Sequence, residues 1–205
     1  MKGQTIAYPI GNNLYLNVTN RCSNNCVFCI RNTEEGVGFN LWLQQEPSFS
    51  DLQAALAGAQ HYREVVFCGY GEPLQRLELV KKTAAFLKQK GARIRINTNG
   101  QANLVYGRDI TPELKGLADV ISISLNAGNA AQYVALCRPA MGPAAYGGML
   151  DFTARCRDII PQVVLTVVEW PGVEIEKCRE IASRLGVSFR VRPFSGTLKK
   201  QQAKP

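Results

Sequence analysis

Three cysteines near the N-terminus have the spacing of ligands to a single soft metal centre. Cys22, Cys26 and Cys29 lie in the segment RCSNNCVFC, with three residues between the first two cysteines and two between the last two. Thiolates select zinc, copper(I) or iron–sulfur clusters. A structural zinc site fills all four coordination positions with protein ligands, whereas three ligands leave one position open for chemistry. The spacing therefore predicts a metal site with one open position.

A zinc site completed by histidine is the first alternative. His61 is the only histidine of the chain. It precedes a predicted strand at 64–68, whereas the cysteines follow a predicted strand at 14–19. Parallel strands would place the two at opposite ends of the sheet, so sharing one metal requires a large detour.

Other polar residues also follow predicted strands. At or directly after the carboxyl ends of strands are the segment Gly69, Tyr70, Gly71, Glu72 and Pro73, the segment Thr98, Asn99 and Gly100, and the positions Asn126, Glu169 and Arg192. Ser122 and Ser124 lie within the fourth strand, Arg190 lies within the sixth, and Arg138 follows the fourth strand further along the chain. Functional groups of parallel α/β folds gather at the carboxyl ends of the strands. These residues are accordingly candidates for one common site, with anion binding or exposure to solvent as the two interpretations of Arg190 and Arg192.

The elements that must position these residues alternate along the chain. Periodicity predicts six strands, at 14–19, 64–68, 93–98, 119–126, 162–169 and 188–194. Helices are predicted at 50–63, with Ser50 and Gln53 as a capping box, at 75–90, from Thr111 as N-cap, between the fourth and fifth strands, and at 174–185 up to Gly186. The helical segment that ends at 160 is predicted to break at 141–143 and again at 147–148. Six such units predict parallel βα topology, either a partial barrel or an open doubly wound sheet.

Composition limits the remaining classes. The chain has 205 residues and is 46% hydrophobic, which predicts one globular domain with a core at about 14–194. We find no apolar stretch that would suit a membrane span or a secretory signal, so we expect a cytoplasmic protein. The formal net charge is +8, and the basic tail at 198–205 is either a solvated end or a contact for nucleic acid or an acidic protein. Seven cysteines without an export signal favour metal or thiol chemistry over disulfides.

The motifs together resemble those of the radical S-adenosylmethionine (SAM) superfamily. In that family three cysteines with this spacing hold one [4Fe–4S] cluster, SAM binds the fourth iron, and an aromatic residue before the last cysteine, here Phe28, lies near the adenine. The segment GYGEP resembles the family's GGEP motif, with Tyr70 in place of a glycine, and Asn97-Thr98-Asn99-Gly100 is similar to its T-N-G motif. The resemblance implies a six-unit partial (β/α) barrel. It also implies SAM contacts by these members of the motifs: Phe28, Gly69, Tyr70, Gly71, Glu72, Pro73, Thr98, Asn99, Ser124, Asn126 and Arg138.

The resemblance further implies an activity. A one-electron donor such as flavodoxin or ferredoxin reduces the cluster, SAM is cleaved to methionine and a 5′-deoxyadenosyl radical, and the radical abstracts hydrogen from a substrate that the sequence does not identify. The segments NVTNRCSNNCVFCIR and GYGEPL are most similar to the motifs of small radical SAM proteins associated with TatD-type hydrolases. This similarity suggests a hydrolase as pathway partner.

Three enzyme alternatives and one other class remain open. They are a glycyl-radical activating enzyme, a ring-forming enzyme similar to 7-carboxy-7-deazaguanine synthase, a radical SAM enzyme acting on nucleic acid or nucleotides, and a zinc- or RNA-binding module without catalysis. Cys156 and Cys178 share helix faces with apolar residues and are predicted core, whereas Cys68 and Cys137 are candidates for a catalytic thiol. The segment 32–48, with Phe39, Trp42 and Glu46, either covers the site or lies on the surface.

Overall fold

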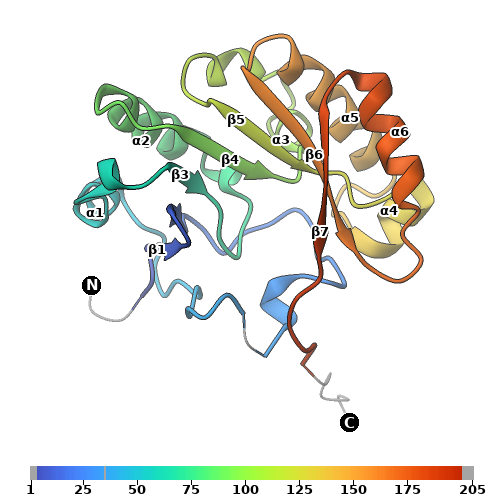
Figure 1. The fold of residues 1–205 in the computed structure, drawn as a ribbon, viewed down its shortest axis with the longest axis horizontal. Coiled ribbons are helices and arrows are strands. Elements are labelled where there is room, and N and C mark those ends of the chain that lie inside the picture. The colour runs from blue at the N-terminus through green and yellow to red at the C-terminus, as the bar shows by residue number, and fades with distance from the viewer. Residues whose placement is uncertain (1–3, 35, 200–205) are drawn as a thin grey trace.

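Seven strands form one curved sheet in the computed structural model, which describes residues 4–34 and 36–199. Their order across the sheet follows their order along the chain (Figure 1). The neighbours from β2 to β7 are parallel, and β1 is antiparallel to β2. Because β1 and β7 lie at opposite edges, the sheet is an open, partial (β/α) barrel, as predicted. The strands are β1 (Ala7–Ile10), β2 (Asn13–Leu16), β3 (Glu64–Phe67), β4 (Ile94–Thr98), β5 (Val120–Ser124), β6 (Gln162–Glu169) and β7 (Ser188–Pro193).

The helices lie along the outer face of the sheet (Figure 1). Side chains of a strand alternate between its two faces, so Ile121 and Ile123 of β5 point outward together. Both are fully buried and belong to one hydrophobic core with Phe152 of α5 and Ile181 of α6. The helices are α1 (Phe49–Ala55), α2 (Leu77–Gln89), α3 (Ala102–Tyr106), α4 (Ala130–Cys137), α5 (Ala144–Arg157) and α6 (Ile175–Leu185), with short 3-10 helices at Ile30–Asn32, Ala59–His61, Pro73–Arg76 and Thr111–Leu114.

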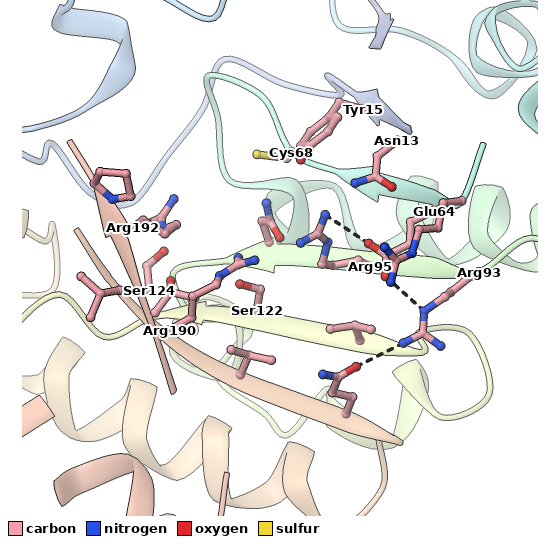
Figure 2. Close-up of a pocket in the computed structure, with 18 residues that line it drawn as sticks. Asn13, Tyr15, Glu64, Cys68, Arg93, Arg95, Ser122, Ser124, Arg190 and Arg192 are labelled. Atoms are coloured by element: carbon pink, nitrogen blue, oxygen red, sulfur yellow. Dashed lines mark hydrogen bonds and ion pairs between the residues drawn. The ribbon is translucent and has the colours of Figure 1, made fainter. Parts of the chain in front are cut away.

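The inner face of the sheet is polar. Ser122 and Ser124 of β5, Thr166 of β6, and Arg190 and Arg192 of β7 line a space of about 920 Å³, here called the interior cavity (Figure 2). The apolar outer face thus buries the core, and the polar inner face is left for a ligand.

The first strand of the structure was not predicted. β1 forms a hairpin with β2, turning at Gly11 and Asn12, and supplies an antiparallel seventh strand where the sequence predicted six parallel ones. Pro9 lies within this short strand, and proline in a strand argues against a central position. The edge position tolerates it, because one side of an edge strand needs no backbone donors.

Several helix boundaries also differ from the prediction. α1 begins after Ser48, which forms the capping box with Asp51, so the predicted pair Ser50 and Gln53 was wrong. α5 runs without a break through Gly147 and Gly148, because neither glycine has the positive φ that ends a helix. The 3-10 helix at Thr111–Leu114 has Ile110 rather than Thr111 as its N-cap, and α3 was not predicted. Gly186 does end α6, with φ at 66°.

The end of the described chain lies beside the cysteine segment. Leu198 pairs with Thr33 in an isolated bridge, and the Lys199 amide donates to the Asn32 carbonyl at 2.7 Å. The rest of the predicted basic tail, residues 200–205, lies outside the described residues. Within 4–34 and 36–199, no helix has the length and apolar character needed to cross a bilayer.

Candidate functional site

The three cysteines of the motif lie on the loop that follows β2, at the carboxyl edge of the parallel sheet. All three thiols are free, and the three residues are half-buried. Three free thiols on one loop are the donor set of an iron–sulfur cluster, and the chemistry of the residues therefore fits this group.

The three sulfurs do not converge as they stand. The Cys22 sulfur accepts from the Asn24 amide at 3.4 Å, and the Cys29 sulfur accepts from Arg31 Nε at 3.3 Å. Cys26 lies close enough to Cys137 for the two thiols to interact. In the described part of the chain, no three cysteine, histidine or acidic side chains are close enough to hold a metal. Binding a cluster therefore requires these side chains to leave their present contacts.

The environment of the thiols favours their protonated form. Burial raises the pKa of Cys22 to about 12, and the interaction with Cys137, together with burial, raises the pKa of Cys26. Metals bind the thiolate. Cluster binding must therefore release protons, and it becomes more favourable as the pH rises.

Glu72 of the GYGEP segment connects two of the predicted motifs. Its Oε1 accepts from Thr98 Oγ1 at 2.8 Å and from the Leu74 amide at 3.0 Å, and its Oε2 accepts from the Asn99 amide at 2.7 Å. Glu72 is 5% exposed, and its burial raises the pKa of the carboxyl group. It also caps the 3-10 helix that opens with Pro73. In this structure Glu72 fixes the loops after β3 and β4 to each other.

Asn99 continues this connection to the cysteine loop. Its Nδ2 donates to Ser23 Oγ at 2.8 Å and approaches Cys22 Sγ at 3.9 Å. We call Ser23, Glu72, Thr98 and Asn99 the rim network. It joins the loops after β2, β3 and β4, which the sequence placed at one edge without showing how they contact each other.

A second buried polar cluster beneath the cysteine loop was missed by sequence reasoning. Gln101 Nε2 donates to Asn24 Oδ1 at 2.7 Å and to the Tyr133 hydroxyl at 3.0 Å, and Asn24 Nδ2 donates to the same hydroxyl at 3.1 Å. Asn24, Gln101 and Tyr133 are all buried. The only sequence signals were two amide residues next to motif positions, Asn24 between the cysteines and Gln101 after the T-N-G segment.

The glycines of the GYGEP segment are required by contacts within the chain. A Cβ at Gly71 would lie 2.3 Å from the Thr19 carbonyl oxygen, and a Cβ at Gly69 would lie 2.1 Å from Asn17 Oδ1. The resemblance implied that these glycines contact SAM. The structure shows close approach to the residues that lead into the cysteine loop, which alone suffices to require glycine there.

The segment 32–48 packs beside Tyr70, the residue that departs from the GGEP pattern. Leu41 is buried with Tyr70, and Trp42, which is 47% exposed, lies edge-on to the Tyr70 ring at 5.1 Å. Glu46 binds Arg21 of the cysteine loop at 2.9 Å. The segment therefore lies against the site edge, with Trp42 partly open to solvent.

The other predicted SAM-binding residues lie at the same sheet edge but in different surroundings. Ser124 lines the interior cavity. Asn126 is buried in a left-handed conformation with φ at 55°, and its Oδ1 accepts from the Val168 amide at 3.2 Å. Arg138 is exposed and lines a smaller cavity of about 520 Å³ with Trp170 and Lys199. The structure brings Ser124 to the interior cavity, and it does not bring Arg138 there.

Phe28 belongs to an aromatic group at the site edge. Its ring lies 5.7 Å from that of Trp170, which lies 4.9 Å from Phe194. Trp170 follows β6 and Phe194 follows β7, so the loop carrying the cysteines packs against residues that directly follow the last two strands of the sheet. Sequence reasoning found Phe28 from its place in the motif and missed its two aromatic neighbours.

The structure separates His61 from the cysteines. His61 ends the 3-10 helix that precedes β3, whereas the cysteine loop follows β2, and the two strands are parallel. The side chain is exposed and contacts Gln60. A zinc site shared by His61 and the three cysteines is not compatible with this arrangement.

The comparison with protein families defines the class. The Radical SAM superfamily profile matches residues 16–185, most of the chain, and the chain belongs to this superfamily. Its members are enzymes that use a [4Fe–4S] cluster and SAM, and they require an electron donor and a substrate. The expectations of an enzyme with these two cofactors are thereby confirmed at the level of the superfamily.

Individual relatives cover parts of the same fold. The chain is 30% identical over 122 residues to uncharacterized protein MJ0804 of Methanocaldococcus jannaschii. The matched region covers 58% of this chain and 35% of that protein. The crystal structure of Streptococcus suis SuiB has a TM-score of 0.66 at 15% identity, covering 88% of this chain and 40% of that one. Methylornithine synthase (PylB) gives 0.61 at 16% identity, covering 90% and 53%. These structures share the fold, and the chain spans about a third of the length of the curated relative.

Proposed function

We propose that this chain cleaves SAM reductively at a [4Fe–4S] cluster held by Cys22, Cys26 and Cys29 and initiates radical chemistry on a substrate. The observation that carries the proposal is the rim network, which joins the cysteine loop through Asn99 to Glu72 of the GYGEP segment. A structural metal site needs the cysteines alone, and it has no use for a hydrogen-bonded link to two further motifs.

The groups that bind at this edge supply the reactive chemistry. When bound, the cluster and SAM supply an electron and a 5′-deoxyadenosyl radical that takes a hydrogen atom from the substrate. The protein's part is to bind, align and exclude water. The three thiols are the cluster ligands, and Glu72 is a positioning residue that holds Thr98 and Asn99 in place through its carboxylate. Phe28, Gly69, Tyr70, Gly71, Pro73, Ser124, Asn126 and Arg138 remain the proposed SAM contacts.

The partners follow from the class. We assign reduction of the cluster to a separate one-electron donor such as flavodoxin or ferredoxin, because the other four cysteines of the chain are scattered and three of them, Cys137, Cys156 and Cys178, are core residues. The narrower resemblance to the TatD-associated proteins rests on the residues of the cysteine and GYGEPL motifs. We retain it as a proposal, together with a hydrolase in the same pathway.

The size of the interior cavity favours a small-molecule substrate. Sites for small molecules and cofactors have volumes of roughly 300–1,000 Å³, and the interior cavity has about 920 Å³. The cavity runs along the inner face from Arg63 and Glu64 near the amino ends of the strands to Ser124 and Arg192 near their carboxyl ends, which supports a substrate that reaches the carboxyl edge. This single continuous sheet supports the prediction of one radical SAM core domain over about 14–194.

The test is anaerobic reconstitution with iron and sulfide, followed by electron paramagnetic resonance of the reduced protein with and without SAM. We expect a reduced [4Fe–4S] signal that SAM changes, and formation of 5′-deoxyadenosine. A chain that holds one zinc ion and leaves SAM intact would overturn the proposal. Cys178→Ala is the matched control, because Cys178 is buried on α6 away from the motif.

A further inference from the structure

The interior cavity is strongly cationic. Its lining has one acidic residue, Glu64, and five arginines, namely Arg63, Arg93, Arg95, Arg190 and Arg192. Figure 2 shows Arg95 entering from β4 and Arg190 and Arg192 from β7, on two sides of the same space. Five guanidinium groups against one carboxylate create a positive potential in a concave space, which attracts anions.

The single carboxylate is already occupied. Glu64 binds Arg93 at 3.1 Å through Oε1 and Arg95 at 3.1 Å through Oε2. Within the described residues, Arg190 and Arg192 have no carboxylate within ion-pair distance. Among the described residues Arg63 also lacks such a partner, but Arg190 and Arg192 lie together on β7, so two unneutralised charges lie at the side of the cavity away from Glu64.

The polar groups around these two arginines also lack partners. Arg192 Nε and Arg95 Nε are buried without a hydrogen-bond acceptor. Ser122 and Ser124 line the cavity, and their hydroxyls make no hydrogen bond to other described residues. Buried donors are ordinarily paired in folded proteins, so unpaired ones that face a cavity indicate a ligand with acceptor atoms.

The register places these donors around one position. Ser124 pairs across the sheet with Thr166, and Thr166 pairs with Arg190, so a row of polar side chains crosses β5, β6 and β7. Arg192 lies one pleat closer to the carboxyl edge. Its burial, with Arg190 nearby, lowers the pKa of its guanidinium, which is the signature of charge that lacks a counterion.

We infer that the substrate bound in the interior cavity is a small molecule with an oxyanion group, phosphate or carboxylate, held by Arg190 and Arg192 with Ser122 and Ser124. This inference rests on the proposed function, because it names the substrate class of that site. Guanidinium forks bind phosphate and carboxylate in a bidentate manner. An excess of four positive charges, five arginines less one glutamate, favours a ligand with more than one negative charge.

The test is calorimetric binding of two probes, pyrophosphate and citrate, to the reconstituted protein with SAM present. We expect binding of at least one probe. Tighter binding of pyrophosphate identifies a phosphorylated substrate, and tighter binding of citrate identifies a polycarboxylate. Arg190→Gln and Arg192→Gln should each weaken binding roughly 10-fold to 100-fold, since each removes a hydrogen-bonded charge. Arg190→Lys keeps the charge without the fork and should lie between.

The matched control is Arg184→Gln, which makes the same charge change on exposed α6, outside the cavity. This variant should bind both probes as the wild type does. Arg190 is exposed, so its substitution tests binding without a risk to folding.

Three results would overturn the inference. The first is that neither probe binds. The second is that Arg184→Gln weakens probe binding as much as Arg190→Gln and Arg192→Gln do. The third is that SAM displaces the probe, which would assign the arginines to the SAM carboxylate. Formation of 5′-deoxyadenosine is measured in parallel. A protein that cleaves SAM and binds neither probe contradicts the inference alone, and one that binds a probe through Arg190 and forms no cluster contradicts the proposed function alone.

Discussion

The rim network and the interior cavity both consist of polar residues, but they differ in whether those residues have hydrogen-bond partners within the chain. In the rim network, both oxygens of Glu72 are occupied by Thr98, Leu74 and Asn99, and Asn99 is in turn bound to Ser23. In the interior cavity, Arg192 has no acceptor for Nε. Paired groups fix a geometry, whereas unpaired groups are available to a ligand. This difference matches our proposals, in which the rim network holds the loops that bind the cofactors in a fixed arrangement and the unpaired groups of the interior cavity bind the substrate.

Cys22→Ser should give the largest effect and separate the two regions. We expect loss of cluster binding and of 5′-deoxyadenosine formation, because two thiolates remain where three are proposed. Binding of pyrophosphate or citrate in the cavity should persist, because Cys22 is absent from its lining. Iron and sulfide analysis and calorimetry measure the two properties. Retention of a full cluster by the variant would contradict the ligand assignment.

Gly71→Ala should lower the free energy of unfolding of the protein by about 3 kcal/mol, which is at the upper end of the usual cost of overpacking. The new Cβ would lie 2.3 Å from the Thr19 carbonyl oxygen and 2.6 Å from that of Arg21, and backbone must move to admit it. Gly147→Ala is the control, because no atom lies within 4 Å of a Cβ there and the residue is inside α5. It should stabilise the protein by about 0.4–1 kcal/mol. Urea denaturation measures both, and equal stability of the two variants would contradict the packing argument.

Glu72→Gln should cost about 2 kcal/mol and weaken SAM binding. The amide nitrogen cannot accept hydrogen bonds, so at least one of the donors Thr98, Leu74 and Asn99 loses its partner. Denaturant unfolding and SAM titration measure the two effects. Unchanged SAM affinity would show that the carboxylate serves the fold only.

The same variant has a pH signature. Burial raises the folded-state pKa of Glu72 above its ordinary value, so the folded protein binds more protons than the unfolded chain between these two values. The contribution of Glu72 to the free energy of unfolding therefore falls as the pH rises through this window and is constant above it. Glu72→Gln should lack this dependence. Urea titrations of both proteins from acidic to neutral pH check the sign, and parallel curves would contradict it.

Ser122→Ala should have the smallest effect, within about 0.5 kcal/mol, because the Ser122 hydroxyl has no partner to lose. Thr98→Val makes a similar deletion in the rim network, where the hydroxyl donates to Glu72 and accepts from the Gly100 amide. It should cost about 1–2 kcal/mol. Thermal or urea unfolding compares the pair. If both deletions cost the same, the distinction between the two regions is wrong.

Sequence patterns predicted those features of the structure that are determined by residues close together in the chain. The cysteine segment, the presence of six parallel strands and the termination of α6 at Gly186 follow from local spacing and composition, whereas the choice of a partial barrel over a doubly wound sheet came from the family resemblance. The boundaries of β6 at 162–169 were predicted as observed, because its apolar run is long and starts after a proline.

Features that depend on distant residues were not predicted. Two of the partners of Glu72, Thr98 and Asn99, are 26 and 27 residues away, and the side-chain partners of Gln101 are 77 and 32 residues away. The requirement for glycine at position 71 comes from the backbone of Thr19 and Arg21. No pattern within one segment contains these contacts, because register and loop path determine them.

The strand order also determines when the site is completed during synthesis. Each strand of the sheet lies beside the strand that precedes it in the chain, so every new strand can add to the free edge of those already folded. The rim network needs nothing beyond Asn99, the residue that follows β4, whereas Arg190 and Arg192 arrive with β7. A ribosome-bound chain can thus form the rim network before it contains the two arginines that we assign to the substrate.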